Sequence, residues 1–275
     1  MMLPWSGSAL GIADLGFVSG ARRPFIVGIA GSQNAGKTTI LGAWYLLLGR
    51  GAVDIANRTF AGSYSFAGWE AVSGSMRWEP GQPAGFPPHT SSRGGRAPGM
   101  LHISFWDAND SKSKDYLFTD APGEWFQKWA VNGDSSEGIG ARWVANRADV
   151  ILIVADREAL AGERMGTTRN GLKLLARRIA NERRKQPVAL VWTKSDVIIS
   201  QEIETAIRDS VIGLMPDAVE FSVSVVANES GDSNNGLGLI ELLKWILAAR
   251  RAAVDLPPAA GGREDPLFMF GERSN

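Results

Sequence analysis

The stretch GIAGSQNAGKTTIL, residues 28 to 41, carries the strongest structural signal in this chain. The run that enters it, residues 25 to 29, is apolar and partly β-branched, and the run that leaves it, residues 39 to 48, is rich in Leu. The first kind of run is typical of a buried strand and the second of a helix. The sequence therefore predicts a strand, a tight loop and a helix in this order.

The loop between the expected strand and helix matches the pattern G-x-x-x-x-G-K-[ST]. A loop of this kind turns successive backbone N–H groups inward at the positive end of a helix, which suits the phosphates of a nucleotide. Lys37 would reach the outer phosphates, and the Thr38 hydroxyl would ligate Mg²⁺. The alternative is a Gly-rich turn that only caps the helix. The predicted phosphate-binding residues are Gly31, Asn34, Ala35, Gly36, Lys37, Thr38 and Thr39.

Length and composition favour one domain with large insertions. The chain has 275 residues, of which 44% are hydrophobic, enough for a full core. We expect an N-terminal arm at residues 1–22, a nucleotide-binding domain at 23–255 with an insertion at about 50–100, and a C-terminal tail at 256–275. The formal net charge is zero, which argues against nucleic acid as the main partner.

Cysteine content and hydropathy favour the cell interior. The chain has no cysteine, which excludes disulfides, thiol nucleophiles and Cys-based zinc sites. It has no run of about eighteen apolar residues, and its N-terminus lacks the basic head and apolar core of a signal peptide. We expect a cytoplasmic protein without a transmembrane segment.

Strand-like and helix-like runs alternate after residue 100. LHISFW (101–106) and DYLFTD (115–120) predict a hairpin, in which His102 should face solvent. Further strands are expected at residues 150–155, 188–193 and 219–225, and helices at 66–76, 168–184, 201–214 and 237–253. This pattern predicts a three-layer α/β fold with a mostly parallel sheet, one antiparallel edge strand and helices on both faces. The loops after the strands should line one sheet edge, where ligands bind.

A second motif ends the expected hairpin. FTDAPGE places Asp120 and Gly123 in a D-x-x-G arrangement. The carboxylate could hold Mg²⁺ through water, and the glycine would let a backbone N–H approach a terminal phosphate. The alternative is an ordinary turn, because Asp and Gly are frequent turn residues.

A third motif, TKSD at residues 193–196, ends the expected strand VALVWT. Asp196 could accept two hydrogen bonds from the N1–H and exocyclic amine of guanine, and the aliphatic stem of Lys194 could lie over the purine. Taken alone, the motif is equally a solvated turn. If it is accidental, an ATP-using kinase or ATPase is the alternative function.

With GSQNAGKT, DAPG and TKSD in this order, the chain resembles the P-loop GTPases of the translation-factor-related class, which includes Ras-like proteins. The resemblance covers about residues 24 to 255. It implies the P-loop NTPase fold, binding of GTP or GDP with Mg²⁺, and slow hydrolysis as a timer. The spacing and the stretch FAGSYSFAGWE also resemble bacterial double-GTPase domains of GTPase-associated operons.

Two positions depart from the family pattern. Thr193 stands where the base-reading motif usually begins with Asn, a substitution that dynamin-like GTPases share. Glu124 follows the D-x-x-G glycine, where Ras-like proteins have a water-orienting Gln. A carboxylate beside a triphosphate is repelled unless it is protonated or paired with a cation. Hydrolysis is therefore expected to be slow, or to depend on another residue.

The resemblance also implies a switch threonine and a last base-recognition loop. Thr90, in the Pro- and Gly-rich segment 80–99, is the candidate that senses Mg²⁺ and the terminal phosphate, with Ser91 and Ser92 as alternatives. A disordered insertion is the competing interpretation of this segment. In the last loop, Ser224 is the nearest counterpart of the residues that contact guanine.

These features predict a GTP-binding protein that hydrolyses GTP slowly and signals its nucleotide state to protein partners. It would be a monomer or a nucleotide-dependent dimer. A non-hydrolysing pseudo-GTPase scaffold is the alternative, supported by Glu124 and Thr193. The expected catalytic residues are Lys37, Thr90, Gly123 and Glu124, and the expected metal ligands are Thr38, Asp120 and Thr90.

Overall fold

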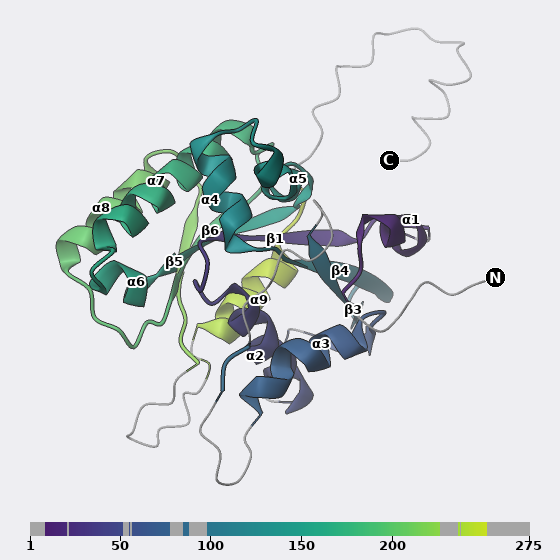
Figure 1. Ribbon diagram of the computed structural model, residues 1–275. Helices are drawn as coiled ribbons and strands as arrows, with labels where there is room; N and C mark the ends of the chain where they lie inside the picture. The colour runs from purple at the N-terminus through teal and green to yellow at the C-terminus, as the bar shows by residue number, and fades with distance from the viewer. Residues whose placement is uncertain are drawn as a thin grey trace, which may run out of the picture.

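The computed structural model describes residues 9–20, 22–51, 55, 57–77, 85–87, 98–225, 236 and 238–251, and all structural statements concern these residues. They form a seven-stranded sheet with helices on both faces (Figure 1). The strand order across the sheet is β2-β3-β4-β1-β5-β6-β7. The strands are β1 (Phe25–Gly31), β2 (Arg58–Gly62), β3 (Gly99–Asp107), β4 (Lys112–Asp120), β5 (Val150–Asp156), β6 (Val188–Thr193) and β7 (Val219–Ser222).

The sheet is mostly parallel. All neighbouring strands from β4 to β7 are parallel, whereas β3 runs antiparallel to β4, and β2 antiparallel to β3. The predicted α/β class is therefore confirmed. The antiparallel strand β3 is not the outermost one, because β2 pairs along its other side. Strand β2 has only five residues, RTFAG. They do not alternate between apolar and polar, which is the pattern by which strands are predicted.

Helices cover the two faces of the sheet (Figure 1). On one face lie α2 (Lys37–Gly49), α3 (Phe66–Ser73) and α9 (Leu239–Ala248). On the other lie α1 (Leu15–Val18), α4 (Gly123–Val131), α5 (Ile139–Arg147), α6 (Arg157–Ala161), α7 (Met165–Glu182) and α8 (Gln201–Ile212). Short 3-10 turns occur at η1 (Ile12–Asp14), η2 (Gly74–Met76) and η3 (Ser136–Gly138). None of the helices in the described ranges is long and apolar enough to cross a bilayer.

The hydrophobic core lies on both sides of the central strands. Every residue of β5 and β6 is buried, as expected for parallel strands that carry helices on both faces. On the α2 side, the fully buried Trp44 donates its indole N–H to the carbonyl of Leu239, at 2.8 Å. This bond fixes α2 against the first residue of α9.

The predicted elements agree with the structure in kind and differ at their ends. The hairpin is β3 and β4, and the helix expected at residues 66–76 is α3 followed by η2. The strand expected at 219–225 ends at Ser222, and the helix expected at 237–253 spans only Leu239–Ala248. Leu10 of the N-terminal segment is buried and pairs with Met100 of β3. The domain boundaries stay predictions.

His102 shows where the sequence prediction was wrong, because its side chain is only 2% exposed rather than facing solvent. Its Nδ1 accepts the Tyr64 N–H at 3.0 Å, and its Nε2 lies 3.1 Å from a carboxylate oxygen of Asp115. The connection between β2 and α3 covers this face of β3. The alternation of polar and apolar residues along β3 does not predict this cover, because the connection is a separate segment. The hydrogen bond with His102 is the main cause that lowers the pKa of Asp115.

We predict that His102→Ala lowers the free energy of unfolding by about 2 to 3 kcal/mol, because it leaves a cavity and removes the acceptor of the Tyr64 N–H. Urea unfolding at neutral pH measures the change. Lys112→Ala, an exposed change in the same hairpin, is the control and should alter stability by less than about 0.5 kcal/mol. Equal stabilities of the two variants would contradict a buried, bonded His102.

Candidate functional site

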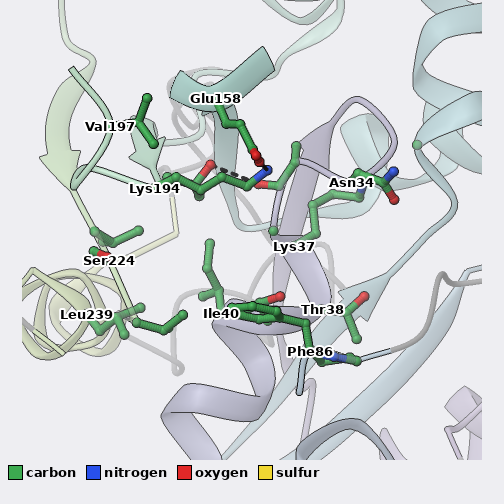
Figure 2. Close-up of a pocket in the computed structure, with 18 of the residues that line it drawn as sticks. Asn34, Lys37, Thr38, Ile40, Phe86, Glu158, Lys194, Val197, Ser224 and Leu239 are labelled. Carbon is green, nitrogen blue, oxygen red and sulfur yellow. Dashed lines mark hydrogen bonds and ion pairs between the residues drawn. The ribbon is translucent and has the colours of Figure 1, made fainter. Parts of the chain in front are cut away.

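A cavity of about 530 Å³ lies at the carboxyl ends of the parallel strands, between the loops that follow β1, β5, β6 and β7 (Figure 2). This is the sheet edge at which open α/β folds bind ligands. The phosphate loop and the TKSD motif, which form the two ends of the predicted site, both line this cavity. The predicted site residues that line it are Asn34, Ala35, Gly36, Lys37, Thr38, Thr39, Gly123, Thr193, Lys194, Asp196 and Ser224.

Among the predicted residues that the structure describes, three are not part of the cavity lining. Gly31 is the last residue of β1, directly before the loop. Asp120 contacts the site through Thr38, and Glu124 acts on Lys37 through its charge. Thr90 lies outside the described residues, so its assignment as switch threonine stays a prediction.

The loop after β1 has the backbone of a phosphate-binding turn. Asn34 and Gly36 adopt left-handed conformations, with φ of 60° and 84°, and α2 begins at the next residue. Gly36 suits this position because glycine adopts positive φ without strain. The N-terminus of α2 therefore faces the cavity with its first N–H groups, which is the arrangement that favours anions.

Lys37 folds back over the loop. Its Nζ donates to the carbonyl oxygens of Gly31 at 3.2 Å and Ser32 at 2.7 Å, and the residue is only 7% exposed. Burial lowers the pKa of Lys37 to about 8, although the negative charges of Asp120 and Glu124 partly oppose this effect. Burial therefore disfavours the charged form of Lys37, and the oxygens of a bound phosphate would favour it.

Thr38 and Asp120 form a pair of oxygen ligands of the kind that Mg²⁺ prefers. The Thr38 hydroxyl donates to Oδ1 of Asp120 at 2.9 Å, so the start of α2 and the end of β4 meet here. No group of three or more His, Cys, Asp or Glu side chains suited to a metal occurs in the described part of the chain. Mg²⁺ is usually held by one or two protein oxygens together with phosphate oxygens and water, and a hydroxyl beside a carboxylate suits such a site.

Gly123 brings the D-x-x-G segment directly against the phosphate loop. A Cβ atom at this position would lie 2.1 Å from the backbone nitrogen of Gln33 and 2.3 Å from the carbonyl carbon of Ser32. Only glycine allows this approach. Gly123 is the first residue of α4, so a movement of the phosphate loop would be transmitted to this helix.

Thr193 joins the opposite end of the cavity to the phosphate loop. Its hydroxyl lies 2.9 Å from the carbonyl oxygen of Ala35 and 3.3 Å from that of Ala155, and the residue is buried. Nearby, the Ser224 hydroxyl donates to Oδ1 of Asp196 at 2.5 Å. The carboxylate predicted to read guanine is therefore oriented by the residue predicted in the last recognition loop.

Several cavity residues were not predicted from the sequence. Phe86 and Pro87, from the Pro- and Gly-rich segment, lie at the cavity, and Phe86 is more than half exposed (Figure 2). Apolar side chains form the wall near Ser224, and Glu158 lies beside Lys194 (Figure 2). No single motif marks these positions, because they come from seven separate segments of the chain. Besides Phe86 and Pro87, the unpredicted apolar lining residues are Ile40, Ala121, Val197, Val223, Val225 and Leu239.

The fold and the three loops define a P-loop GTPase. A model of the Double-GTPase 2 family matches residues 25–246, and the chain belongs to this family. The resemblance to P-loop GTPases of the double-GTPase type is thereby confirmed, and the family supports binding of GTP. No curated protein matches the chain.

A similar solved structure is titled "Structure of methanosarcina barkeri Roco2 RocCORdC bound to GDP". It shares 15% sequence identity with this chain, with a TM-score of 0.41. The match covers 83% of this chain and 50% of the Roco2 chain, so this protein corresponds to about half of that structure's length.

We predict that GDP binding takes up protons near pH 8. The phosphates should raise the pKa of Lys37 from about 8 in the free protein, so the bound state holds more protons and affinity falls as pH rises through this value. Calorimetry between pH 7 and 8.5, below the range in which the N1–H of guanine ionises, measures both effects in buffers of different ionisation enthalpy. Lys37→Arg should remove them, because arginine stays charged. An affinity that is constant over this range would contradict the role of Lys37.

We predict that Gly123→Ala lowers the free energy of unfolding by about 2 kcal/mol, because the new methyl group forces α4 away from the phosphate loop. Chemical denaturation measures this change. Gly171→Ala in α7 is the matched control, since a Cβ there meets no atom within 4 Å. It should stabilise the protein by up to about 1 kcal/mol, as alanine does inside a helix. A Gly123→Ala protein as stable as wild type would show that the close approach is not required.

Proposed function

We propose that the protein hydrolyses GTP slowly to GDP and phosphate in a Mg²⁺-dependent reaction, and that it acts as a nucleotide-dependent switch. The observation that carries the proposal is the hydrogen bond between Thr38 and Asp120. The bond joins Thr38, at the start of α2, to Asp120 of the D-x-x-G segment, and the charge of Asp120 also acts on Lys37. These contacts support a shared role of the two residues in holding Mg²⁺. GTP is the substrate and water the nucleophile.

Each residue has a role that follows from its position. Lys37 and the N–H groups at the start of α2 would bind the outer phosphates and stabilise negative charge on the transferring phosphoryl group. Thr38 and Asp120 would hold Mg²⁺, which neutralises phosphate charge when bound. Gly123 would offer its backbone N–H to the terminal phosphate. Thr90 stays our candidate for the switch threonine, on the sequence resemblance alone.

Glu124 supports a low intrinsic rate. Its negative charge acts on Lys37, so it lies in the electrostatic field of the site. A carboxylate in this position cannot orient water as an amide does without repulsion from the triphosphate. We therefore expect hydrolysis to be slow until a partner or another residue assists it.

Switching would act through the segments at residues 85–99 and 121–140. The second of these contains α4, whose Phe126 and Trp129 are buried in the core that α4 shares with α5 and α7. If the terminal phosphate holds Gly123, its loss on hydrolysis would release the start of α4 and change the surface beside it. A protein partner would sense this change.

Glu124 also favours one alternative, a pseudo-GTPase scaffold that binds GTP without hydrolysing it. The two functions share the nucleotide site and differ in phosphate release. Stoichiometric GTP binding with no phosphate release over many hours, with and without candidate partners, would support the scaffold.

We predict that GTP and GDP compete for one Mg²⁺-dependent site and that ATP does so at least about tenfold more weakly. Lys37→Ala should weaken GTP binding by about tenfold or more, because it removes a charge-assisted contact. Lys244→Ala, which removes an exposed lysine on α9, is the control and should bind like wild type. Calorimetry measures binding, and a phosphate assay measures turnover. Equal affinities of wild type and Lys37→Ala would overturn the site assignment, and preference for ATP would overturn the substrate.

A further inference from the structure

The side chain of Lys194 is held by two carboxylates that no sequence motif marks. Its Nζ donates to Oδ2 of Asp156 at 2.8 Å. It also donates to Oε2 of Glu158 at 2.7 Å (Figure 2). Both contacts draw the ammonium toward the start of α6. The four-carbon stem therefore extends along the cavity wall instead of into solvent.

Asp156 makes this arrangement rigid. Its side chain is only 3% exposed, and its other carboxylate oxygen, Oδ1, accepts the backbone N–H groups of Glu158 and Ala159 at 3.0 and 3.3 Å. One carboxylate thus holds Lys194 and also caps the helix that presents Glu158. A charged group this deeply buried is held by its hydrogen bonds, unlike a surface ion pair whose geometry is loose.

Arg157, which lies between Asp156 and Glu158 in the sequence, fixes the start of α6 through contacts of its own. The guanidinium of Arg157 forms an ion pair with Glu204 at 3.2 Å and lies 5.5 Å from the ring centre of the buried Trp192. The start of α6 is therefore fixed between α8 and the cavity. Glu158 itself is 68% exposed, so the fixed backbone, and not packing, determines where its carboxylate lies.

Lys194 also has a constrained backbone, with φ of 53°. A non-glycine residue in this region is uncommon and is maintained by its surroundings. Burial acts to lower the pKa of Lys194, but the hydrogen bonds and charges of Asp156 and Glu158 outweigh it and raise this pKa. Lys194 therefore stays charged, and stays tethered, throughout the neutral range.

We propose that Asp156 and Glu158 are positioning residues that hold the Lys194 stem along the cavity wall and so raise the affinity for the nucleoside part of a guanine nucleotide. The inference rests on the proposed function, because it assumes that a guanine nucleotide occupies the cavity. A tethered stem presents a fixed apolar surface to the purine, so less side-chain entropy is lost on binding than with a free lysine. Together, Asp156 and Glu158 form what we call the carboxylate clamp.

The experiment compares variants that change only charge. Glu158→Gln removes one half of the carboxylate clamp, and Glu163→Gln removes the same charge from an exposed position near the start of α7, outside the cavity lining. GDP and inorganic pyrophosphate are titrated into each protein by calorimetry with Mg²⁺ present. Pyrophosphate is the probe for the phosphate end alone, because it has neither base nor ribose.

We expect Glu158→Gln to weaken GDP binding by about fivefold, the scale of a partly exposed ion pair, and to leave pyrophosphate binding within about twofold of the Glu163→Gln value. In a Lys194→Ala background, where the tethered group is absent, Glu158→Gln should change GDP affinity by less than about twofold. A general loss of structure would affect both ligands and both backgrounds, so this pattern separates positioning from stability.

The failure of this inference differs from the failure of the proposed function. If wild type binds neither GDP nor GTP, the proposed function fails and the carboxylate clamp has no role. If wild type binds GDP and Glu158→Gln matches Glu163→Gln, only the carboxylate clamp is overturned. An equal loss of GDP and pyrophosphate affinity, or an undiminished effect in the Lys194→Ala background, also overturns it.

Discussion

The buried hydroxyl of Thr193 is the link on which the site depends. It lies within hydrogen-bonding distance of the carbonyl oxygens of Ala35 and Ala155, and so joins the end of β6 to the end of β5 and to the phosphate loop that follows β1. Two of these strands are not neighbours, since β5 separates β1 from β6. Without such a link, the phosphate loop and the loop after β6 could shift independently. A threonine hydroxyl is enough for this task, so the departure from the usual asparagine does not disconnect the two ends of the cavity.

The two ends of the cavity offer different groups to a ligand. One end has the N–H groups at the start of α2 and the buried Lys37 ammonium, on which Asp120 and Glu124 act through their charges. The other end has the carboxylates of Glu158 and Asp196 beside Lys194. A ligand with phosphates at one end and hydrogen-bond donors at the other matches this distribution in one orientation only. Guanosine phosphates have that character, because guanine presents N–H donors to a carboxylate.

Local patterns predicted the parts of the molecule that local chemistry determines. The strand, loop and helix around Lys37 follow from a continuous stretch, and alternating elements were enough to predict the α/β class. His102 was wrongly expected to face solvent because a separate connection, through Tyr64, covers it. The partners of Lys194 were missed for the same reason, since Asp156 and Glu158 follow a different strand. Phe86 lies in the Pro- and Gly-rich segment, and this composition predicts no regular element from which its contacts could be inferred.

The place of β1 in the sheet also determines when the phosphate loop can take its shape. Val27 pairs with Phe118 on one side and Val150 on the other, so both neighbours of β1 are encoded far downstream. Contacts between such distant residues form late, because closing long loops costs chain entropy before any pairing is gained. During synthesis, a ribosome must therefore release β5 before the loop at Lys37 is supported on both sides. Until then the nascent chain has the binding motif without a binding site.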